Sequence, residues 1–301
     1  MLSALNYVII PQLHAKYRHV HFPVYIYVAG ARVHPHLLFE GLAYVAGFLV
    51  YLWIRRRFGD TVPDPVRWSA ITAAVAGGAI GSKLVYLLEA PAATLQHGSD
   101  PFYLMGGKSI VGGLVGGLMA VEWVKKYLGE KQSTGDLFAI PLALGIAIGR
   151  IGCFLTGLGD YTYGIPTRLP WGIDFGDGIA RHPTQLYEMV FLFALVPALQ
   201  FVLGRVARTS LTARAGREYV ASRFQSGDAF KLFMIAYMAF RLVCDALKPY
   251  VHVAFGLGSI QWICLLTLLY YAKDMRRWLK PKKLAAEKPA EEMQEVKEGA
   301  F

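Results

Sequence analysis

Six ionisable residues stand inside long apolar stretches of the chain: Glu40, Lys83, Arg150, Glu188, Arg241 and Asp245. A charge at the centre of a bilayer is costly, so such side chains face the protein interior or a water-filled cavity. The arginine guanidinium is a planar fork of donors that matches the oxygens of a phosphate. Arg150 and Arg241 therefore predict a phosphate-binding cavity, and in a membrane they indicate the headgroup of a phospholipid.

The same charges also have a purely structural interpretation, in which they pair with one another and lock the helices together. Arg241 and Asp245 are four residues apart and share a helix face. Glu40 could likewise pair with Lys83. Both interpretations remain open from these residues alone.

A second candidate for chemistry is the string RHPTQLYE at residues 181–188. Pro183 suits the first turn of a helix, which places His182 at the mouth of that helix. Gln185 and Glu188 are three residues apart and share a face below it. His182 could act as a general base near neutral pH, or its ring could hold a loop by a hydrogen bond.

A glycine-rich loop, GGKSIVGG at residues 106–113, precedes another apolar stretch. Such loops can bring backbone N–H groups close to a phosphate. Glycines also allow close helix packing in membranes, and we expect that role for Gly112, Gly113, Gly116 and Gly117.

These residues need a membrane-embedded scaffold, and the composition supports one. The 301-residue chain is 55% hydrophobic and 17% charged, against about 25% charged residues in soluble domains. Apolar segments of about 20 residues can span a bilayer as helices. Seven are predicted, at residues 37–54, 68–90, 109–124, 136–157, 184–204, 229–247 and 258–275.

Lys and Arg residues gather in alternate loops between these segments, with the densest groups after residues 54, 124, 204 and 272. By the positive-inside rule those loops are cytoplasmic. Seven spans then place the amino terminus outside and the carboxyl terminus inside. The net charge of +10 follows this membrane-orientation pattern, so no nucleic-acid partner is expected.

The sequence divides into three parts. Residues 1–36 form an outer-face segment with a short hairpin, in which Val24–Val28 and Arg32–His34 flank an Ala-Gly-Ala turn. Residues 37–275 form the transmembrane domain, with a loop region on the outer face. Residues 276–301 form a charged cytoplasmic tail, whose mixture of Lys, Glu, Pro and Ala from Lys280 onward predicts disorder. The three cysteines match no disulfide or zinc spacing, and no metal or cofactor is expected.

Three segments give the chain a resemblance to the bacterial prolipoprotein diacylglyceryl transferase family. They are GRIGCF at residues 149–154 followed by Gly157 and Gly164, the string at residues 181–188, and Ala239-Phe240-Arg241 with Asp245 and Gln261. Gly81-Ser82-Lys83 and the glycine-rich loop support the match, which spans about residues 37–275.

The resemblance implies a multi-pass enzyme of the bacterial cytoplasmic (inner) membrane. Such enzymes transfer a diacylglyceryl group from phosphatidylglycerol to the lipobox cysteine of a prolipoprotein and release glycerol phosphate. Phosphatidylglycerol, the prolipoprotein signal-peptide region and membrane lipid would be the partners. Arg150 and Arg241 would be catalytic by holding the phosphate. The substrate-binding residues would be Lys83, Gly112, Gly113, Gly157, Gly164, Gln185, Tyr187, Glu188 and Gln261.

The chain departs from the family pattern at the position of a usual histidine in the glycine-rich loop, which is Val111 here. Glu40 stands where the family has a tyrosine, and Cys153 where it has an asparagine. Valine cannot transfer a proton, so His182 and Glu40 become the candidates for the catalytic base. Two alternatives remain: a lipid-binding or transport protein without catalysis, and an inactive homologue.

Overall fold

The structure is a computed structural model that describes residues 22–214 and 223–279. The predicted disordered tail from Lys280 lies outside the described residues. Seven longer helices form the body of the described part: α2 (Pro35–Phe58), α3 (Asp64–Glu89), α6 (Ile110–Tyr127), α7 (Ala139–Thr156), α8 (Thr184–Arg214), α9 (Asp228–Cys244) and α10 (Ser259–Tyr270). The shorter elements are β1 (Ile26–Val28), β2 (Ala31–Val33), α4 (Pro91–His97), α5 (Pro101–Met105), β3 (Ile173–Asp174), β4 (Ala180–Arg181), α11 (Ala272–Leu279) and the 3-10 turns η1 (Asp136–Phe138), η2 (Gly157–Asp160) and η3 (Asp245–Leu247).

Every segment predicted to span the membrane is helical over most of its length. Four of the described helices are long and apolar enough to cross a membrane: α2, α3, the η1–α7–η2 unit over Asp136–Asp160, and the Thr184–Thr209 part of α8. The remaining three segments correspond to α6, α9 and α10, which have 18, 17 and 12 residues. The structure thus supports an all-α membrane protein with four candidate spans.

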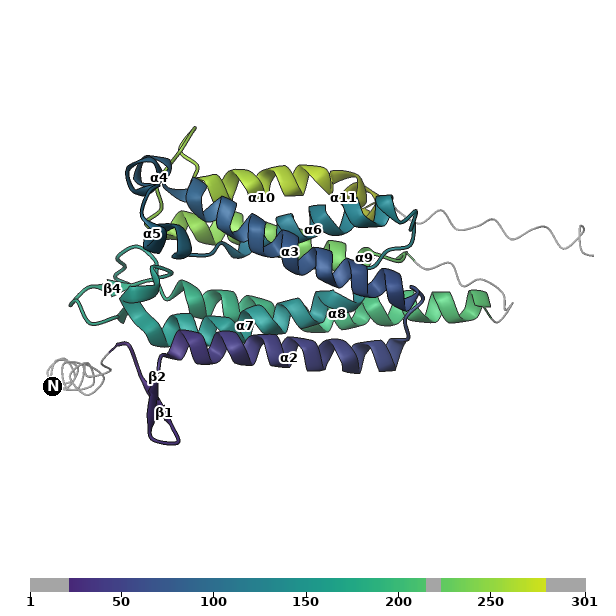
Figure 1. The fold of residues 1–301 in the computed structure, drawn as a ribbon, viewed down its shortest axis with the longest axis horizontal. Helices are drawn as coiled ribbons and strands as arrows, with labels where there is room; N and C mark the ends of the chain where they lie inside the picture. Colours follow the sequence, from purple (N-terminus) through teal and green to yellow (C-terminus); the bar gives the residue numbers. More distant parts are fainter. Residues whose placement is uncertain (1–21, 215–222, 280–301) are drawn as a thin grey trace, which may run out of the picture.

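The longer helices run roughly side by side, so their connections lie at two opposite ends of the bundle (Figure 1). The β1–β2 hairpin, α4, α5 and β4 gather at one end, together with the loops that are poor in Lys and Arg. The far end carries the basic loops and the end of α8. The predicted hairpin is confirmed, with Val28 paired to Ala31 around a tight turn. Ala29 and Gly30 both have positive φ there, as the favoured two-residue hairpin turn requires.

Helices α3 and α6 approach each other closely through small residues. A Cβ added at Gly77, Gly81, Gly112 or Gly116 would overlap atoms of the facing helix. Because these glycines have no side chains, the two helix backbones can meet, which is how membrane helices commonly pack. The packing role expected for Gly112 and Gly116 is therefore confirmed.

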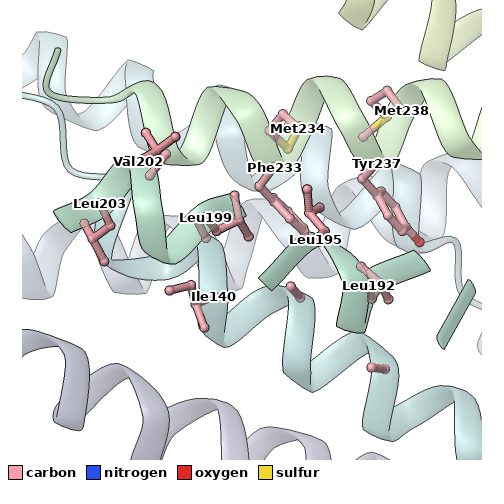
Figure 2. Close-up of a cluster of buried hydrophobic side chains, with 14 of the residues drawn as sticks. Ile140, Leu192, Leu195, Leu199, Val202, Leu203, Phe233, Met234, Tyr237 and Met238 are labelled. Atoms are coloured by element: carbon pink, nitrogen blue, oxygen red, sulfur yellow. The ribbon is translucent and has the colours of Figure 1, made fainter. Parts of the chain in front are cut away.

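The apolar core lies between α7, α8 and α9, as Figure 2 shows. Its labelled side chains are Ile140, Leu192, Leu195, Leu199, Val202, Leu203, Phe233, Met234, Tyr237 and Met238. By contrast, only 11% of the apolar window of α2 is buried, and Tyr44, Phe48 and Trp53 on it are exposed. Such an apolar outer surface is suited to lipid.

Candidate active site

Arg150 on α7 and Glu188 on α8 meet inside the helix bundle. Arg150 Nε and Glu188 Oε2 lie 2.8 Å apart, and both residues are buried. Neither atom has a hydrogen-bond partner among the described residues. It follows that the N–H of Arg150 does not point at the oxygen. The contact is therefore one of charge without a well-aligned hydrogen bond. Tyr237 on α9 donates a 2.5 Å hydrogen bond to Glu188 Oε1.

Arg241 continues this network on α9. Its Nη1 donates to the Tyr237 hydroxyl at 3.3 Å. Its Nε and Nη2 donate to the two oxygens of Asp245 at 3.0 and 2.9 Å, which confirms the pairing expected from their spacing. Lys248 Nζ lies 3.2 Å from Asp245 Oδ1, and its side chain is buried as well.

The buried network has more positive than negative charge. Arg150, Arg241 and Lys248 contribute three cations, while Glu188 and Asp245 contribute two carboxylates. Glu89 lies within electrostatic range of Arg241 and Lys248, but it is partly exposed at the end of α3. Because an uncompensated buried charge is unfavourable, the network is suited to an anion.

A second polar cluster surrounds His36 at the start of α2. His36 Nδ1 lies 2.9 Å from Asp160 Oδ1, and its Nε2 lies 3.6 Å from Glu40 Oε2. Cys153 Sγ lies 4.0 Å from His36 Nδ1 and 3.6 Å from Arg150 Nη1. Cys153 therefore joins this cluster to the arginine network.

Glu40 pairs with a different lysine from the one predicted. Its Oε1 accepts hydrogen bonds from Lys108 at 2.6 Å and from the Tyr44 hydroxyl at 2.9 Å. Lys83 instead donates to the carbonyl oxygens of Gly106 and Gly107. The predicted Glu40–Lys83 pair is therefore wrong, because the glycine-rich loop supplies acceptors for Lys83 and places Lys108 beside Glu40.

Gln185 links the two clusters from α8. Its Nε2 donates to Thr162 Oγ1 at 3.1 Å, and Thr162 donates to Asp160 Oδ2 at 3.2 Å. Gln185 Oε1 and Glu188 Oε2 are buried acceptors that receive no hydrogen bond from the described residues. Glu188 Oε2 has the charge of Arg150 beside it, and both oxygens can still accept a hydrogen bond from water or from a hydroxyl of another molecule.

His182 belongs to a third group, in the loop region before α8. Its Nδ1 lies 3.1 Å from the Tyr187 hydroxyl, which also accepts a 2.8 Å hydrogen bond from Trp171 Nε1. Among the described residues His182 forms no hydrogen bond or ion pair with either arginine. In the same region Arg181 donates to Asp177 at 2.7 Å and lowers the pKa of that carboxyl.

The remaining predicted residues are glycines at close backbone approaches and Gln261, which bonds to backbone atoms. Gly157 ends α7 with a positive φ, and a Cβ there would strike Phe22. A Cβ at Gly164 would strike His182. Gln261 uses its amide to accept from Gly258 N at 3.0 Å and to donate to Leu242 O at 3.2 Å. Gly112 and Gly113 lie on the α3–α6 contact. Val111, which precedes them in the sequence, is fully buried.

Three residues of the His36 cluster have the chemistry of metal ligands. His36, Cys153 and Asp160 offer one nitrogen, one sulfur and one oxygen atom, all within 4.8 Å of one another. The sequence alone does not predict this group, because the three residues follow no zinc spacing. The four-residue step from His36 to Glu40 on one helix face is the available local signal. Lys248 and Tyr237 were also missed.

Comparison with known proteins gives one consistent result. A sequence profile described as prolipoprotein diacylglyceryl transferase matches residues 23–272. A phosphatidylglycerol–prolipoprotein diacylglyceryl transferase of Bordetella parapertussis is 32% identical over 248 residues, which cover 75% of this chain and 84% of that protein. The protein of the same name from Nitrosomonas europaea is 30% identical over 275 residues, which cover 83% and 90%. That from Nitratidesulfovibrio vulgaris is 38% identical over 177 residues, which cover 52% and 63%.

Proposed function

The chain belongs to the prolipoprotein diacylglyceryl transferase family, and from this membership and its buried site we propose that it transfers the diacylglyceryl group of phosphatidylglycerol to the lipobox cysteine of prolipoproteins. The relatives named above carry both substrates in their names. The reaction takes place within a helical membrane scaffold, for which four helices are long and apolar enough.

The observation that carries the proposal is the excess of one positive charge in the buried network. Arg150 is the member best suited to the lipid phosphate, because among the described residues its Nη1 forms only a long hydrogen bond, to the Cys153 sulfur at 3.6 Å. Arg241 is held in a bidentate pair by Asp245, and it supports the site from the far side of Tyr237. A phosphate entering beside Arg150 would gain charge-assisted hydrogen bonds where water is excluded.

The buried acceptors of Gln185 and Glu188 fit the other half of the headgroup. Phosphatidylglycerol carries a glycerol with two free hydroxyls, and each hydroxyl can donate one hydrogen bond. Gln185 Oε1 and Glu188 Oε2 are the proposed acceptors. A headgroup without these donors would leave Gln185 Oε1 with no partner and Glu188 Oε2 with the Arg150 ion pair alone, which selects against it.

The chemistry is a nucleophilic displacement. The sulfur of the acceptor cysteine attacks the glyceryl carbon of the lipid, the carbon–oxygen bond breaks, and its electron pair leaves on glycerol phosphate. Charge that grows on the departing phosphate is stabilised by Arg150, with Arg241 and Lys248 behind it. His182 is the proposed acceptor of the thiol proton, since the carboxylate of Glu40 is held by Lys108 and Tyr44.

The proposed arrangement in the membrane has seven crossings over residues 37–275, with the Lys- and Arg-rich loops in the cytoplasm. The amino terminus, the start of α2 with His36, the η2 turn with Asp160 and the loop with His182 then lie on the outer face of a bacterial cytoplasmic membrane. This places the site at the surface where signal peptides of exported proteins emerge.

The transfer is tested with the purified chain in nanodiscs, phosphatidylglycerol labelled in its headgroup, and a lipobox peptide. We expect the peptide to gain the mass of a diacylglyceryl group and labelled glycerol phosphate to be released in equal amount. The matched control is a peptide with serine in place of the cysteine. A peptide of unchanged mass, in an assay where another family member works, would overturn the proposal.

An inactive, lipid-binding homologue is the second candidate. The observation that favours it is the fully buried Val111, which cannot exchange a proton. Binding of phosphatidylglycerol without release of glycerol phosphate would support this alternative. Lipid flux across proteoliposomes without transfer would support a transport protein instead.

A further inference from the structure

His36, Cys153 and Asp160 come from separate places in the sequence but converge at one point. His36 stands at the start of α2, Cys153 in the last turns of α7, and Asp160 at the end of η2. His36 Nδ1 lies 2.9 Å from Asp160 Oδ1 and 4.0 Å from Cys153 Sγ. No other group of three or more such side chains is found within the described ranges.

We propose that these three side chains bind a divalent transition metal ion, with Zn²⁺ as the best match, and leave its fourth position open. Zinc takes sulfur, nitrogen and oxygen ligands, and catalytic zinc sites have three protein ligands with one open position. Around a tetrahedral zinc ion the ligand atoms lie roughly 3.3–3.6 Å apart. The observed separations bracket this range, so side-chain shifts of less than an ångström would complete the site.

The surroundings of the three ligands are those of a metal site. His36 would bind through Nδ1, and its Nε2 then faces Glu40 Oε2 at 3.6 Å. Metal-bound histidines usually donate their other N–H to a carboxylate, which fixes the ring. Glu40 is itself held by Lys108 and Tyr44. Asp160 keeps its second oxygen on Thr162 at 3.2 Å.

Two further features of the proposed metal site are the position of Arg150 beside Cys153 and the exposure of the His36 side chain. Arg150 Nη1 lies 3.6 Å from Cys153 Sγ, so the proposed sulfur ligand also borders the arginine network. The His36 side chain is 37% exposed, whereas that of Asp160 is 14% exposed. The proposed site is therefore most accessible from the side of His36.

The metal would act on the acceptor cysteine, and this role rests on the proposed transfer. A thiol that coordinates a zinc ion loses its proton more readily, here to His182, the proton acceptor proposed above. The bound sulfur then forms the carbon–sulfur bond, and the carbon–oxygen electron pair leaves on glycerol phosphate beside Arg150. The metal ion is neither oxidised nor consumed.

The test measures metal content before activity. The full chain, with any affinity tag removed, is loaded with Zn²⁺, desalted and analysed by mass spectrometry of the metal. We expect about one ion per chain in the wild type and loss of at least ten-fold in occupancy for Cys153→Ala and His36→Ala. Cys264→Ala and His97→Ala are the matched controls and should keep the ion. Loading with Co²⁺ should give a sulfur-to-cobalt charge-transfer band that Cys153→Ala abolishes.

Equal metal content in Cys153→Ala and Cys264→Ala, or no tight ion in the wild type, would overturn the proposal. If Cys153→Ala does not fold, Glu40→Gln serves instead and should weaken metal affinity by about 10- to 100-fold. The two proposals fail separately. A bound ion without peptide transfer refutes the transferase function only, and transfer that persists in a metal-free chain refutes only the role of the metal in transfer.

Discussion

Arg150 and Glu188 form a buried ion pair between α7 and α8, with Nε and Oε2 2.8 Å apart. Removing one partner of a buried pair leaves an uncompensated charge, which typically costs about 3–5 kcal/mol. The pair therefore fixes the relative position of two helices, and it presents the outer edge of the guanidinium to the site. This relationship gives the first prediction.

Changing Arg150 to lysine should keep the charge and remove the fork. We expect Arg150→Lys to fold with little loss of thermal stability but to lower the transfer rate by roughly 100-fold, since a point charge cannot grip two phosphate oxygens. Arg56→Lys, on the basic end of α2, is the matched control. Thermal unfolding and initial rates measure the two effects. Transfer by Arg150→Lys at the wild-type rate would remove Arg150 from the phosphate site.

Lys248 should contribute to lipid affinity through the excess positive charge. Its buried amine shares Asp245 with Arg241, so Lys248→Met leaves that carboxylate paired. We expect the KM for phosphatidylglycerol to rise about ten-fold, which corresponds to about 1.4 kcal/mol. Lys126→Met on the exposed end of α6 should leave KM unchanged. The excess-charge argument would be wrong if both variants gave the same KM.

The close contact of α3 and α6 predicts opposite effects for two glycine substitutions. Gly81→Ala introduces a Cβ against the Gly112 and Gly116 backbone, and we expect a loss of about 1–3 kcal/mol in stability. Gly204→Ala in α8 meets nothing within 4 Å, and it should stabilise the helix by about 0.5–1 kcal/mol. Thermal unfolding in one detergent measures both. An unchanged midpoint for Gly81→Ala would contradict the packing described.

Stability should fall in acid through Asp60, which lies between α2 and α3. Burial raises the pKa of this carboxyl, but hydrogen bonds from Arg67 and from Val62 N outweigh it and hold the pKa below its usual value. The folded form therefore binds a proton less readily than the unfolded form. The stabilisation is present above the ordinary aspartate pKa of about 4 and is lost as pH falls through the folded pKa.

Unfolding midpoints from pH 7 down to pH 3 measure this dependence. Asp60→Asn should flatten the decline below about pH 4. The control is Asp64→Asn, whose side chain is 68% exposed, so it should keep the wild-type decline. Identical profiles for the wild type and Asp60→Asn would show that another group controls the acid sensitivity.

The sequence predicts the helices and the hairpin well, because hydropathy, charge and turn chemistry are local properties. It also predicts the Arg241–Asp245 pair, since both residues lie on one helix with a fixed four-residue step. The predicted pairing of Glu40 with Lys83 is wrong because Lys108 reaches Glu40 from a loop 68 residues away. No local pattern encodes such a distance.

The His36 cluster was missed for a related physical reason. Cys153 in an apolar helix has the pattern of a small buried side chain, and only the turn after α7 carries Asp160 back beside His36. Lys248 follows the last residues of a predicted span, where a lysine is expected to face solvent, but the turn at η3 folds it into the protein interior. Sites formed by loops that turn inward depend on tertiary contacts, which hydropathy does not describe.

The position of the lipid phosphate tests the central claim most directly. A structure of the chain in nanodiscs with phosphatidylglycerol would locate it, with a reference in lipids that lack the glycerol headgroup. We predict phosphate oxygens within hydrogen-bond distance of Arg150 and headgroup hydroxyls on Gln185 and Glu188. A headgroup bound elsewhere, with Arg150 still held by Glu188 and Cys153 as it is here, would contradict the account.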